Sequence, residues 1–348
     1  MFDDQFDYVA HVSAAGYEWI PGESFRRESA DPGEHVTGNL LVPRLSAGSE
    51  VARAIQPDHQ DPALFRDFAD LDTSDPDSLL AFANQYGFLE HGERGRTEMR
   101  AELRAEAFAD WVWHIDALRC VIRVHDLVQE GDLAALAPSM TWQPAGPGRP
   151  NGRWVFHGYP GWWGGHRSVF TMPSEWPADL LSAYPGLPPP QQPGLRPSSY
   201  PVTMDSPTPG DDLRLVARAW LYQVVTDTIG HSVNVRLNAD RATGKARLRV
   251  IPSSLCQLLW FQFSRALIAG KDYRRCKECR GWFELPPRER DRKVFCSPAC
   301  KVKDQRTRKA RVAELRTGGR TPKQIADAMG MDIETVRAWI KSTQAKGK

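Results

Sequence analysis

The sequence predicts a mixed α+β fold, and three patterns along its 348 residues point to this class. Alternating apolar and polar residues, as at Val233, Val235 and Leu237, are typical of strands. Apolar residues recur at three- to five-residue spacing from about Thr97 to Gln129, which is typical of one long helix. Glycine and proline residues fall between such stretches and mark the turns that join them.

Residues 1–184 are expected to form an α+β domain of unknown role, with a ligand or a protein as its partner. Short strand-like pieces fill residues 1–60. Asp61-Pro62 and Asp75-Pro76 each open a helix, because aspartate caps a helix N-terminus and proline fits its first turn. The long helix that follows is expected to end at Gly131.

Residues 185–210 are rich in proline and are expected to be a linker or a long loop. Before them, the run GYPGWWGGHR at 158–167 either packs a loop onto a core or lines a pocket. An enzyme whose acid–base residue is His157 or His166 is one alternative for this region. No nucleophile elbow, P-loop, dinucleotide fingerprint or HExxH motif is present, so the chain is not expected to be an enzyme.

Residues 211–270 are expected to form a helix, a β-hairpin and a second helix that support the segment after them. The first helix runs from Asp211 to Ile229, and the turn DRATG joins the two strands of the hairpin. Ser254 caps the second helix, LCQLLWFQFSRALIAG. This helix is apolar almost all round and is therefore expected to be buried.

Charge is divided unevenly along the chain. Residues 271–348 hold 22 Lys and Arg against 10 Asp and Glu, whereas the residues before them hold 23 against 33. Such a basic end points to a polyanionic partner. No apolar run reaches the ~18 residues that a membrane span needs. The N-terminus MFDDQFDYVAHVSA also lacks the order of a signal peptide, so the chain is expected in the cytoplasm, with no membrane partner.

Six cysteines are too few for a disulfide framework in a chain of this length. Cys120 and Cys256 stand alone in apolar helical patterns and are expected to be core thiols. The others form two close pairs on either side of a short basic stretch: Cys276, Cys279, Cys296 and Cys300. Two such pairs supply the four thiolates of one tetrahedral zinc ion in a structural role. The sequence therefore predicts Zn²⁺ as a cofactor of these four cysteines.

The residues around the cysteines predict a knuckle, a hairpin and a helix in that order. Trp282-Phe283 and Val294-Phe295 are expected to be the two strands of the hairpin. Ser297-Pro298 is expected to open a helix whose first turn contains Cys300. This order is that of a treble clef, which is expected over residues 271–311.

The runs YRRCKECRGWF and RKVFCSPACKVKDQRTRKAR resemble the CGNR-type and FCS-type treble-clef fingers of bacterial regulators. The hairpin and apolar helix before them match the usual approach to the finger in CGNR proteins, so the resemblance covers about residues 211–311. After Cys300 the chain has Lys301-Val302-Lys303 where the family has Gly-Asn-Arg. The resemblance implies a zinc-dependent transcription regulator.

Residues 312–348 carry the pattern of a helix-turn-helix. Thr321, followed by proline, suits the start of a first helix, Gly330 supplies a turn with positive φ, and Asp332 caps a second helix. The core between the helices is expected to consist of Ile325, Ala326, Met329, Met331, Val336 and Trp339. The segment Val312–Ile340 resembles the C-terminal DNA-binding segment of resolvase- and invertase-type recombinases, without a recognisable recombinase catalytic domain before it.

In such a module the second helix enters the major groove of DNA. Arg337 is expected to read guanine, Glu334 to accept a hydrogen bond from cytosine, and Lys341 to meet a phosphate. A helix from Pro298 to about Leu315 is expected to join the finger to this module. Its basic side chains suit contacts with the phosphate backbone. They are Lys301, Lys303, Arg306, Arg308, Lys309 and Arg311.

The leading hypothesis is a zinc-finger, helix-turn-helix DNA-binding protein that regulates transcription. Its acidic N-terminal part would sense a ligand or a partner. The alternative is an RNA-binding or ribosome-associated protein, because treble clefs and basic helices also bind RNA. Helix-turn-helix proteins often read paired half-sites, which makes a homodimer a further expectation.

Overall fold

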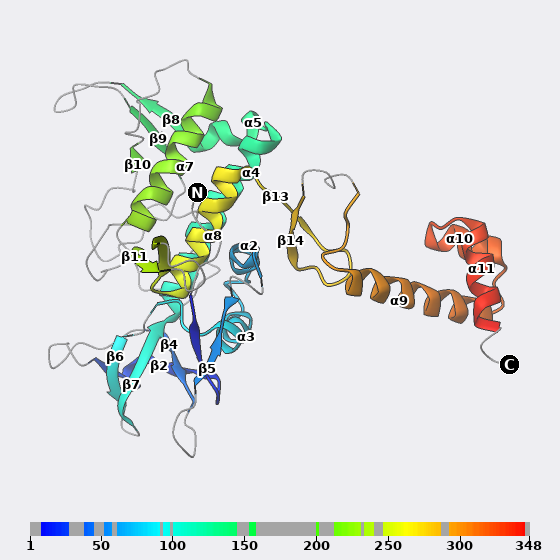
Figure 1. The fold of residues 1–348 in the computed structure, drawn as a ribbon, viewed down its shortest axis with the longest axis horizontal. Helices are drawn as coiled ribbons and strands as arrows, with labels where there is room; N and C mark the ends of the chain where they lie inside the picture. Colours follow the sequence, from blue (N-terminus) through cyan, green and yellow to red (C-terminus); the bar gives the residue numbers. More distant parts are fainter. Residues whose placement is uncertain are drawn as a thin grey trace. The chain divides into compact units, whose positions relative to one another are not determined.

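The structure is a computed structural model, and it describes residues 8–27, 38–44, 52–57, 61–90, 93–97, 100–144, 153–157, 200–201, 212–230, 233–239, 246–286 and 292–344. The chain forms two compact units, which we name unit 1 (residues 1–270) and unit 2 (residues 271–348). Figure 1 shows the elements of both units in chain order. The tryptophan–glycine run with His166 and most of the predicted linker lie outside the described residues.

The described residues contain nine α-helices and several small sheets, which confirms the mixed α+β class. The helices are α2 (Leu64–Ala69), α3 (Pro76–Tyr86), α4 (Phe108–Glu130), α5 (Leu133–Leu136), α7 (Leu213–Gly230), α8 (Leu255–Ala269), α9 (Pro298–Thr317), α10 (Pro322–Met329) and α11 (Ile333–Gln344). Two single 3₁₀ turns are η1 (Gly22–Ser24) and η2 (Ala137–Ser139).

The sheets in the described part of the chain are antiparallel. The largest has the strand order β2 (Tyr17–Pro21), β4 (Asn39–Pro43), β7 (Arg100–Ala107), β6 (Glu93–Thr97) and β3 (Arg26–Arg27). A second sheet has the order β10 (Tyr200–Pro201), β9 (Arg153–Phe156) and β8 (Met140–Gln143). The two-stranded sheets are β1 (Ala10–Ser13) with β5 (Ala52–Ile55), β11 (Val233–Ala239) with β12 (Ala246–Pro252), and β13 (Asp272–Arg275) with β14 (Trp282–Leu285).

Strand β7 corrects the predicted start of the long helix. Residues Arg100–Ala107 pair with β4 and β6, and α4 begins only at Phe108. Leu103 and Ala105, two positions apart, are buried in one cluster with Leu40 of β4, which is the side-chain period of a strand. Alanine, leucine, glutamate and arginine favour helix in isolation, so pairing between two neighbouring strands overrides local propensity here.

Asp61 does not cap a helix as predicted, because α2 begins at Leu64 with Ala63 as its N-cap and without a side-chain cap. The remaining predicted helix limits in unit 1 agree closely with the structure. Asp75 caps α3 by accepting a hydrogen bond from the Asp77 N–H, and α4 ends at Gly131 in the left-handed conformation. The helix, hairpin and second helix predicted after the linker are present as α7, the β11–β12 pair and α8. Ser254 caps α8 by accepting a hydrogen bond from the Gln257 N–H.

Helix α4 makes the core of unit 1 together with α2, α7 and α8, which all pack against it (Figure 1). Trp111 and Phe263 are fully buried. The Phe263 ring centroid lies 5.9 Å from Phe65 and 6.3 Å from Trp260, and Trp111 lies 6.3 Å from Phe68. Tilted and edge-on ring contacts of this kind are the arrangement that aromatic quadrupoles favour. Aromatic packing thus joins α2, α4 and α8.

One ion pair joins α2 to α4 within this core. Arg66, whose side chain is 5% exposed, donates hydrogen bonds of 2.9 Å and 2.7 Å to the two carboxylate oxygens of Asp126. Burial alone would raise the pKa of Asp126, but the hydrogen bonds from Arg66 and His125 outweigh it, so the pKa lies below its ordinary value. The two parallel bonds fix the direction of the guanidinium as well as its distance.

Three helices of unit 2 pack around a small apolar core. Val312 of α9, Ile325 and Ala326 of α10, and Val336 of α11 are buried together. Side chains at the edge of this cluster are Leu315, Met329, Met331, Ile333, Trp339 and Ile340. The core residues predicted from the sequence are therefore confirmed, and α9 is the third helix that packs against α10 and α11.

The ends of α10 and α11 are capped as predicted. The Thr321 hydroxyl accepts a hydrogen bond from the Gln324 N–H, and the side-chain oxygen Oε1 of Gln324 accepts one from the Thr321 N–H at 2.9 Å. Asp332 accepts a hydrogen bond of 2.9 Å from the Thr335 N–H at the start of α11. Between the two helices, Gly330 adopts φ 58° and ψ 41°, in the left-handed region.

Replacing Gly330 with alanine is expected to destabilise unit 2 by about 1 kcal/mol. A Cβ at this position meets nothing within 4 Å, so the cost is that of a left-handed alanine, ~1–2 kcal/mol, less the entropy that alanine removes from the unfolded chain. Chemical unfolding of the Gly330→Ala chain measures it. The matched control is Gly318→Ala, because Gly318 ends α9 at φ −71°, which alanine adopts freely. Equal effects at the two glycines would contradict the argument.

Candidate metal centre and basic surface

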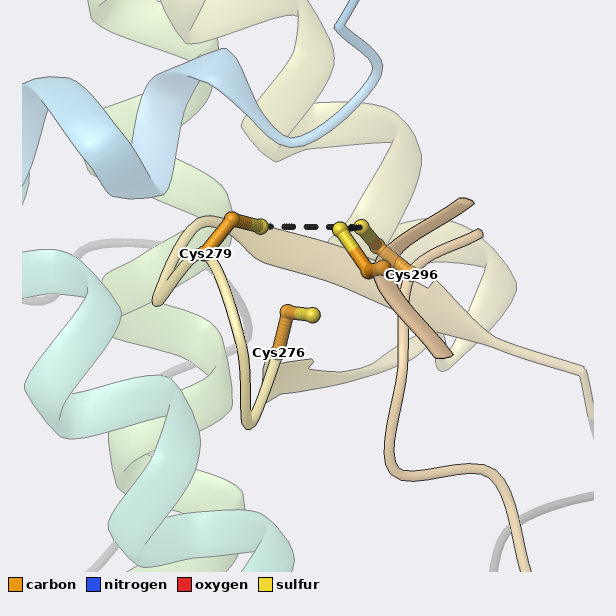
Figure 2. A group of neighbouring side chains, drawn as sticks. Cys276, Cys279 and Cys296 are labelled. Atoms are coloured by element: carbon orange, nitrogen blue, oxygen red, sulfur yellow. Dashed lines mark hydrogen bonds between the residues drawn. The ribbon is translucent and has the colours of Figure 1, made fainter. Parts of the chain in front are cut away.

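Four cysteine side chains meet at the start of unit 2. Cys276 and Cys279 lie in the turn between β13 and β14, Cys296 lies just before α9, and Cys300 lies in its first turn. Their sulfur atoms all lie within 4.8 Å of one another. Figure 2 shows the side chains of Cys276, Cys279 and Cys296 converging from these segments. The structure therefore gathers the predicted ligand set at one point, where it could hold a metal ion.

The first cysteine pair is positioned by the turn that closes the β13–β14 pair. The Cys276 N–H donates to the Gly281 carbonyl at 2.9 Å, and the Arg280 N–H donates to the Cys276 carbonyl at 3.0 Å. Arg280 has φ 65°, which non-glycine residues seldom adopt. This tight turn brings the thiols of Cys276 and Cys279 to the same side of the hairpin.

The strand pairing corrects the predicted hairpin. Trp282-Phe283 lies in β14 as expected, but its partner is β13 (Asp272–Arg275), before the first cysteine pair. Val294-Phe295 lies outside any strand. The Val294 carbonyl instead accepts one hydrogen bond of 3.0 Å from the Lys277 N–H. The residues just before Cys276 are joined to β14 by a short turn. They therefore pair with β14 in the place that was expected for Val294-Phe295.

The second cysteine pair is positioned by the start of α9. Ser297 is the N-cap, as predicted, and its hydroxyl accepts a hydrogen bond of 3.2 Å from the Cys300 N–H. The sulfur of Cys296 lies 3.6 Å from that of Cys279 and 3.5 Å from that of Cys300. These separations exceed the ~2.0 Å of a disulfide bond. The four sulfurs are thus free thiols at ligand-to-ligand distances.

The thiols of the cluster differ in their readiness to ionise. Burial alone would raise the pKa of Cys276, but hydrogen bonds from the backbone N–H groups of Cys279, Cys296 and Glu278 outweigh it and lower the pKa to about 6. Burial raises the pKa of Cys279. Burial, together with hydrogen bonding to the neighbouring thiols, raises the pKa of Cys296 to about 12. The Cys276 thiol is therefore the one that ionises most readily of these three, while Cys279 and Cys296 release protons when a cation binds.

Two ion pairs connect the turn of the first cysteine pair to α9. Lys303 Nζ lies 3.2 Å from Glu278 Oε1, and Lys277 Nζ lies 3.9 Å from Asp304 Oδ1. Both lysines are more than half exposed, so each pair contributes little, about 0–1 kcal/mol. Lys303, predicted to contact phosphate, thus has a carboxylate neighbour in this structure.

The basic side chains predicted on the connecting helix all lie on α9, but on more than one face. Lys301 and Arg308, seven positions apart, share one face, while Lys303 and Arg306, three positions apart, share another. Lys309 is only partly exposed, because its ammonium lies 5.6 Å from the centroid of the Trp339 ring on α11. That contact joins α9 to α11 within unit 2.

Some of these side chains have acidic neighbours and others do not. Arg311 donates to Glu314 at 2.6 Å, one turn along α9. Within the part of the chain that the structure describes, Lys301, Arg306 and Arg308 form no ion pair. Lys301 and Arg306 are also exposed. These two side chains are therefore the most available cations of α9.

Helix α11 presents one exposed stripe opposite its buried face. Glu334, Arg337, Ala338 and Lys341 are all exposed and recur at the spacing of one helix face, whereas Val336 is buried. Arg337 Nη1 lies 2.6 Å from Glu334 Oε1. The structure thus brings together the three charged residues predicted on the second helix.

A further cluster, which the sequence did not predict, lies in unit 1. Cys256, expected to be a core thiol, has its sulfur 3.2 Å from Nδ1 of His114, and Glu90 completes a group whose ligand atoms lie within 4.8 Å of one another. Desolvation lowers the pKa of His114 to about 4 and raises that of Cys256. Cys120, also expected to be a core thiol, is only partly buried, and desolvation raises the pKa of its thiol to about 12.

His157, named for the enzyme alternative, is exposed at the end of β9. Its Nε2 lies 2.7 Å from the Thr141 hydroxyl.

Comparison with known proteins finds no protein-family model, no curated protein and no solved structure that matches this chain. Within the described residues, every helix is too short or too polar to cross a membrane.

Proposed function

We propose that the protein is a zinc-dependent DNA-binding regulator, in which the four cysteines hold Zn²⁺ and α11 enters the major groove. The observation that carries the proposal is the exposed stripe of α11. It lies opposite a packed core, in a unit that holds 22 Lys and Arg against 10 Asp and Glu. A polyanion is the partner that such a charge distribution attracts.

Zinc is supported by the ligand chemistry and by the sulfur separations. In a tetrahedral site with Zn–S bonds of about 2.3 Å, neighbouring sulfurs lie ~3.8 Å apart. The two measured separations of 3.5 Å and 3.6 Å are close to that value. Four cysteine ligands fill the coordination sphere, so the zinc would be structural. A turn with two ligands, followed by a third ligand just before a helix and a fourth in its first turn, is the order of a treble-clef finger.

Helices α10 and α11 supply what a helix-turn-helix requires. The left-handed Gly330 turns the chain between them, Ala326 is small and buried where they cross, and Val336 faces inward. The second helix then offers Glu334, Arg337 and Lys341 to base edges and phosphates. Exposed cations on α9 would add contacts to the phosphate backbone.

The contact between Glu334 and Arg337 does not oppose this role. Both side chains are more than half exposed, and an exposed pair one turn apart on a helix contributes only ~0.3–0.5 kcal/mol. A bidentate contact between arginine and guanine contributes ~1–3 kcal/mol. Arg337 therefore leaves Glu334 readily when a guanine is offered.

Replacing Arg337 and Lys341 together with alanine is expected to weaken binding of the full chain to duplex DNA at least tenfold. The reason is the loss of one base contact and one phosphate contact, which should also reduce the salt slope of log K by about 1. A mobility-shift titration against a pool of duplexes, repeated over a salt series, measures both quantities. The matched control is Arg214→Ala with Arg218→Ala, which removes two exposed charges from α7 in unit 1.

Equal weakening by both double variants would show that charge alone matters and would contradict groove docking by α11. A structured RNA that displaces duplex DNA at equal concentration would replace the DNA assignment with an RNA one. Removal of zinc by a chelator should abolish binding in the parent chain.

A further inference from the structure

We propose that Glu90, His114 and Cys256 form a second metal site, in unit 1, which binds a divalent transition-metal ion and leaves one coordination position open. Glu90 lies in the segment after α3, His114 lies on α4, and Cys256 lies in the first turn of α8. Their ligand atoms lie within 4.8 Å of one another. The proposal does not depend on the four-cysteine cluster, which belongs to unit 2.

The three donors suit one kind of ion. Thiolate, imidazole and carboxylate together are ligands of zinc and of neighbouring transition metals, whereas calcium and magnesium take oxygen alone. In a tetrahedral zinc site, a sulfur and a nitrogen ligand lie ~3.5 Å apart. The 3.2 Å between Cys256 Sγ and His114 Nδ1 is close to that separation.

The charges of this site would cancel. A dication with one thiolate, one carboxylate and one neutral imidazole has no net charge, so enclosing it in protein costs little. Four thiolates around a dication leave a charge of −2. The unit 1 site is thus suited to the interior of a domain, while the unit 2 cluster lies among basic residues.

The ligands are held in place by groups outside the site. The buried carboxyl group of Glu106 accepts hydrogen bonds from the Leu89 N–H at 3.0 Å, the Glu90 N–H at 2.6 Å and Trp111 Nε1 at 2.9 Å. The Cys256 N–H donates to the Leu89 carbonyl at 2.8 Å. These bonds tie the segment that carries Glu90 to both α4 and α8. The site is therefore organised without the ion, which lowers the cost of binding it.

The burial of the three ligands indicates the side from which an ion can reach the site. Cys256 is buried, His114 is partly exposed and Glu90 is exposed. An ion can reach the thiol from the side of Glu90, where its fourth ligand would face solvent. Three protein ligands with an exchangeable fourth position are the arrangement of sites that bind water or a small ligand with a lone pair. Unit 1 would thereby respond to a metal ion or to a ligand bound through it.

The test is the stoichiometry of metal binding by the full chain. The metal-stripped protein is titrated with Co²⁺, whose thiolate charge-transfer bands report each site, and then with Zn²⁺. The parent chain is expected to bind two equivalents, and Cys256→Ser and Cys276→Ser one each, at different sites. Glu90→Gln is expected to weaken the second equivalent at least tenfold. Because Glu90 is exposed, this variant should fold even where Cys256→Ser does not.

The matched control is Cys120→Ser, which removes a thiol from α4 away from the cluster and should keep both equivalents. Far-ultraviolet circular dichroism confirms that each variant is folded. Binding of a single equivalent that Cys276→Ser loses and Cys256→Ser keeps would overturn the proposal. Two equivalents whose affinities are unchanged by Glu90→Gln would overturn it as well, since the second ion would then lie elsewhere.

Discussion

Replacing Cys276 with serine is expected to remove the metal ion from unit 2 and to unfold the turn that binds it. Cys276 is fully buried beside Phe283 and Leu285, and its thiol is the one whose pKa is lowered, to about 6, by backbone N–H groups that outweigh burial. Its thiol is therefore well suited to be a thiolate ligand at neutral pH. Loss of this ligand should lower affinity for zinc by several orders of magnitude.

The expected effect on stability is large because a segment organised around a structural metal ion folds only when the ion binds. Structural zinc contributes roughly 10–16 kcal/mol of binding free energy in zinc-finger peptides at neutral pH. The cysteine segment has a small apolar cluster of its own, Cys276 with Phe283 and Leu285, edged by Phe295. Such a cluster cannot compensate for the loss of the ion.

Thermal unfolding of the full chain, with and without a chelator, measures this prediction. The parent chain should lose the unit 2 transition on chelation, and Cys276→Ser should lack it from the start. Cys120→Ser, which changes a partly buried thiol of unit 1, should unfold as the parent does. A Cys276→Ser chain that keeps both the metal and the transition would refute the assignment of this thiol as a ligand.

Replacing Asp126 with asparagine is expected to destabilise unit 1 by about 2–4 kcal/mol. Arg66 is 5% exposed and Asp126 is 38% exposed. Removing one member of a buried pair costs about 3–5 kcal/mol because the other charge is left unpaired, and the partial exposure of Asp126 reduces this figure. Denaturant unfolding measures the change. Adding Arg66→Met to Asp126→Asn should recover part of the loss, because it removes the unpaired charge.

The Arg66–Asp126 pair also predicts how the stability of unit 1 changes at acidic pH. The pKa of Asp126 is lower in the folded protein than in the unfolded chain. At pH values between these two pKa values, the unfolded chain therefore binds more protons than the folded protein. The contribution of Asp126 to the free energy of unfolding is therefore complete above about pH 4. It is lost as the pH falls through the lower pKa that Asp126 has in the folded protein. Stability of Asp126→Asn should fall less steeply than that of the parent over this acidic range.

Asp116, on the same helix, is the matched control. It pairs with Arg119 at 2.6 Å, but Arg119 also donates to the carbonyls of Ala69 and Leu71. Removing Asp116 leaves that guanidinium with partners, so Asp116→Asn should change stability by less than about 1 kcal/mol. Similar losses for the two aspartates would contradict the role assigned to burial at Arg66.

The parts of the fold that the sequence predicts correctly are those determined by local chemistry. Asp75, Ser254 and Thr321 cap their helices because their side chains reach backbone N–H groups within the same turn. The four cysteines are recognisable as one site because each pair is close in sequence. The core around Ile325 and Val336 follows from helical spacing within about 30 residues.

The parts that the sequence does not predict depend on distant pairing. Residues 100–107 have helical composition, and only the strands on either side make them β7. Likewise, β13 and not Val294-Phe295 pairs with β14. The cluster at Cys256 and His114 joins residues 142 positions apart. Their spacing in the sequence carries no signal, because α4 and α8 become neighbours only in the folded unit.

Helix α9 is a single uninterrupted helix of 20 residues that holds Cys300 in its first turn and Val312 three turns later. Its length thereby sets the distance between the four-cysteine cluster and the three-helix core. Each residue adds ~1.5 Å of length and about 100° of rotation. An insertion of two residues between Cys300 and Val312 would turn the core to the other side of the helix, whereas seven would restore its direction. The number of residues in this stretch thus matters as much as their identity.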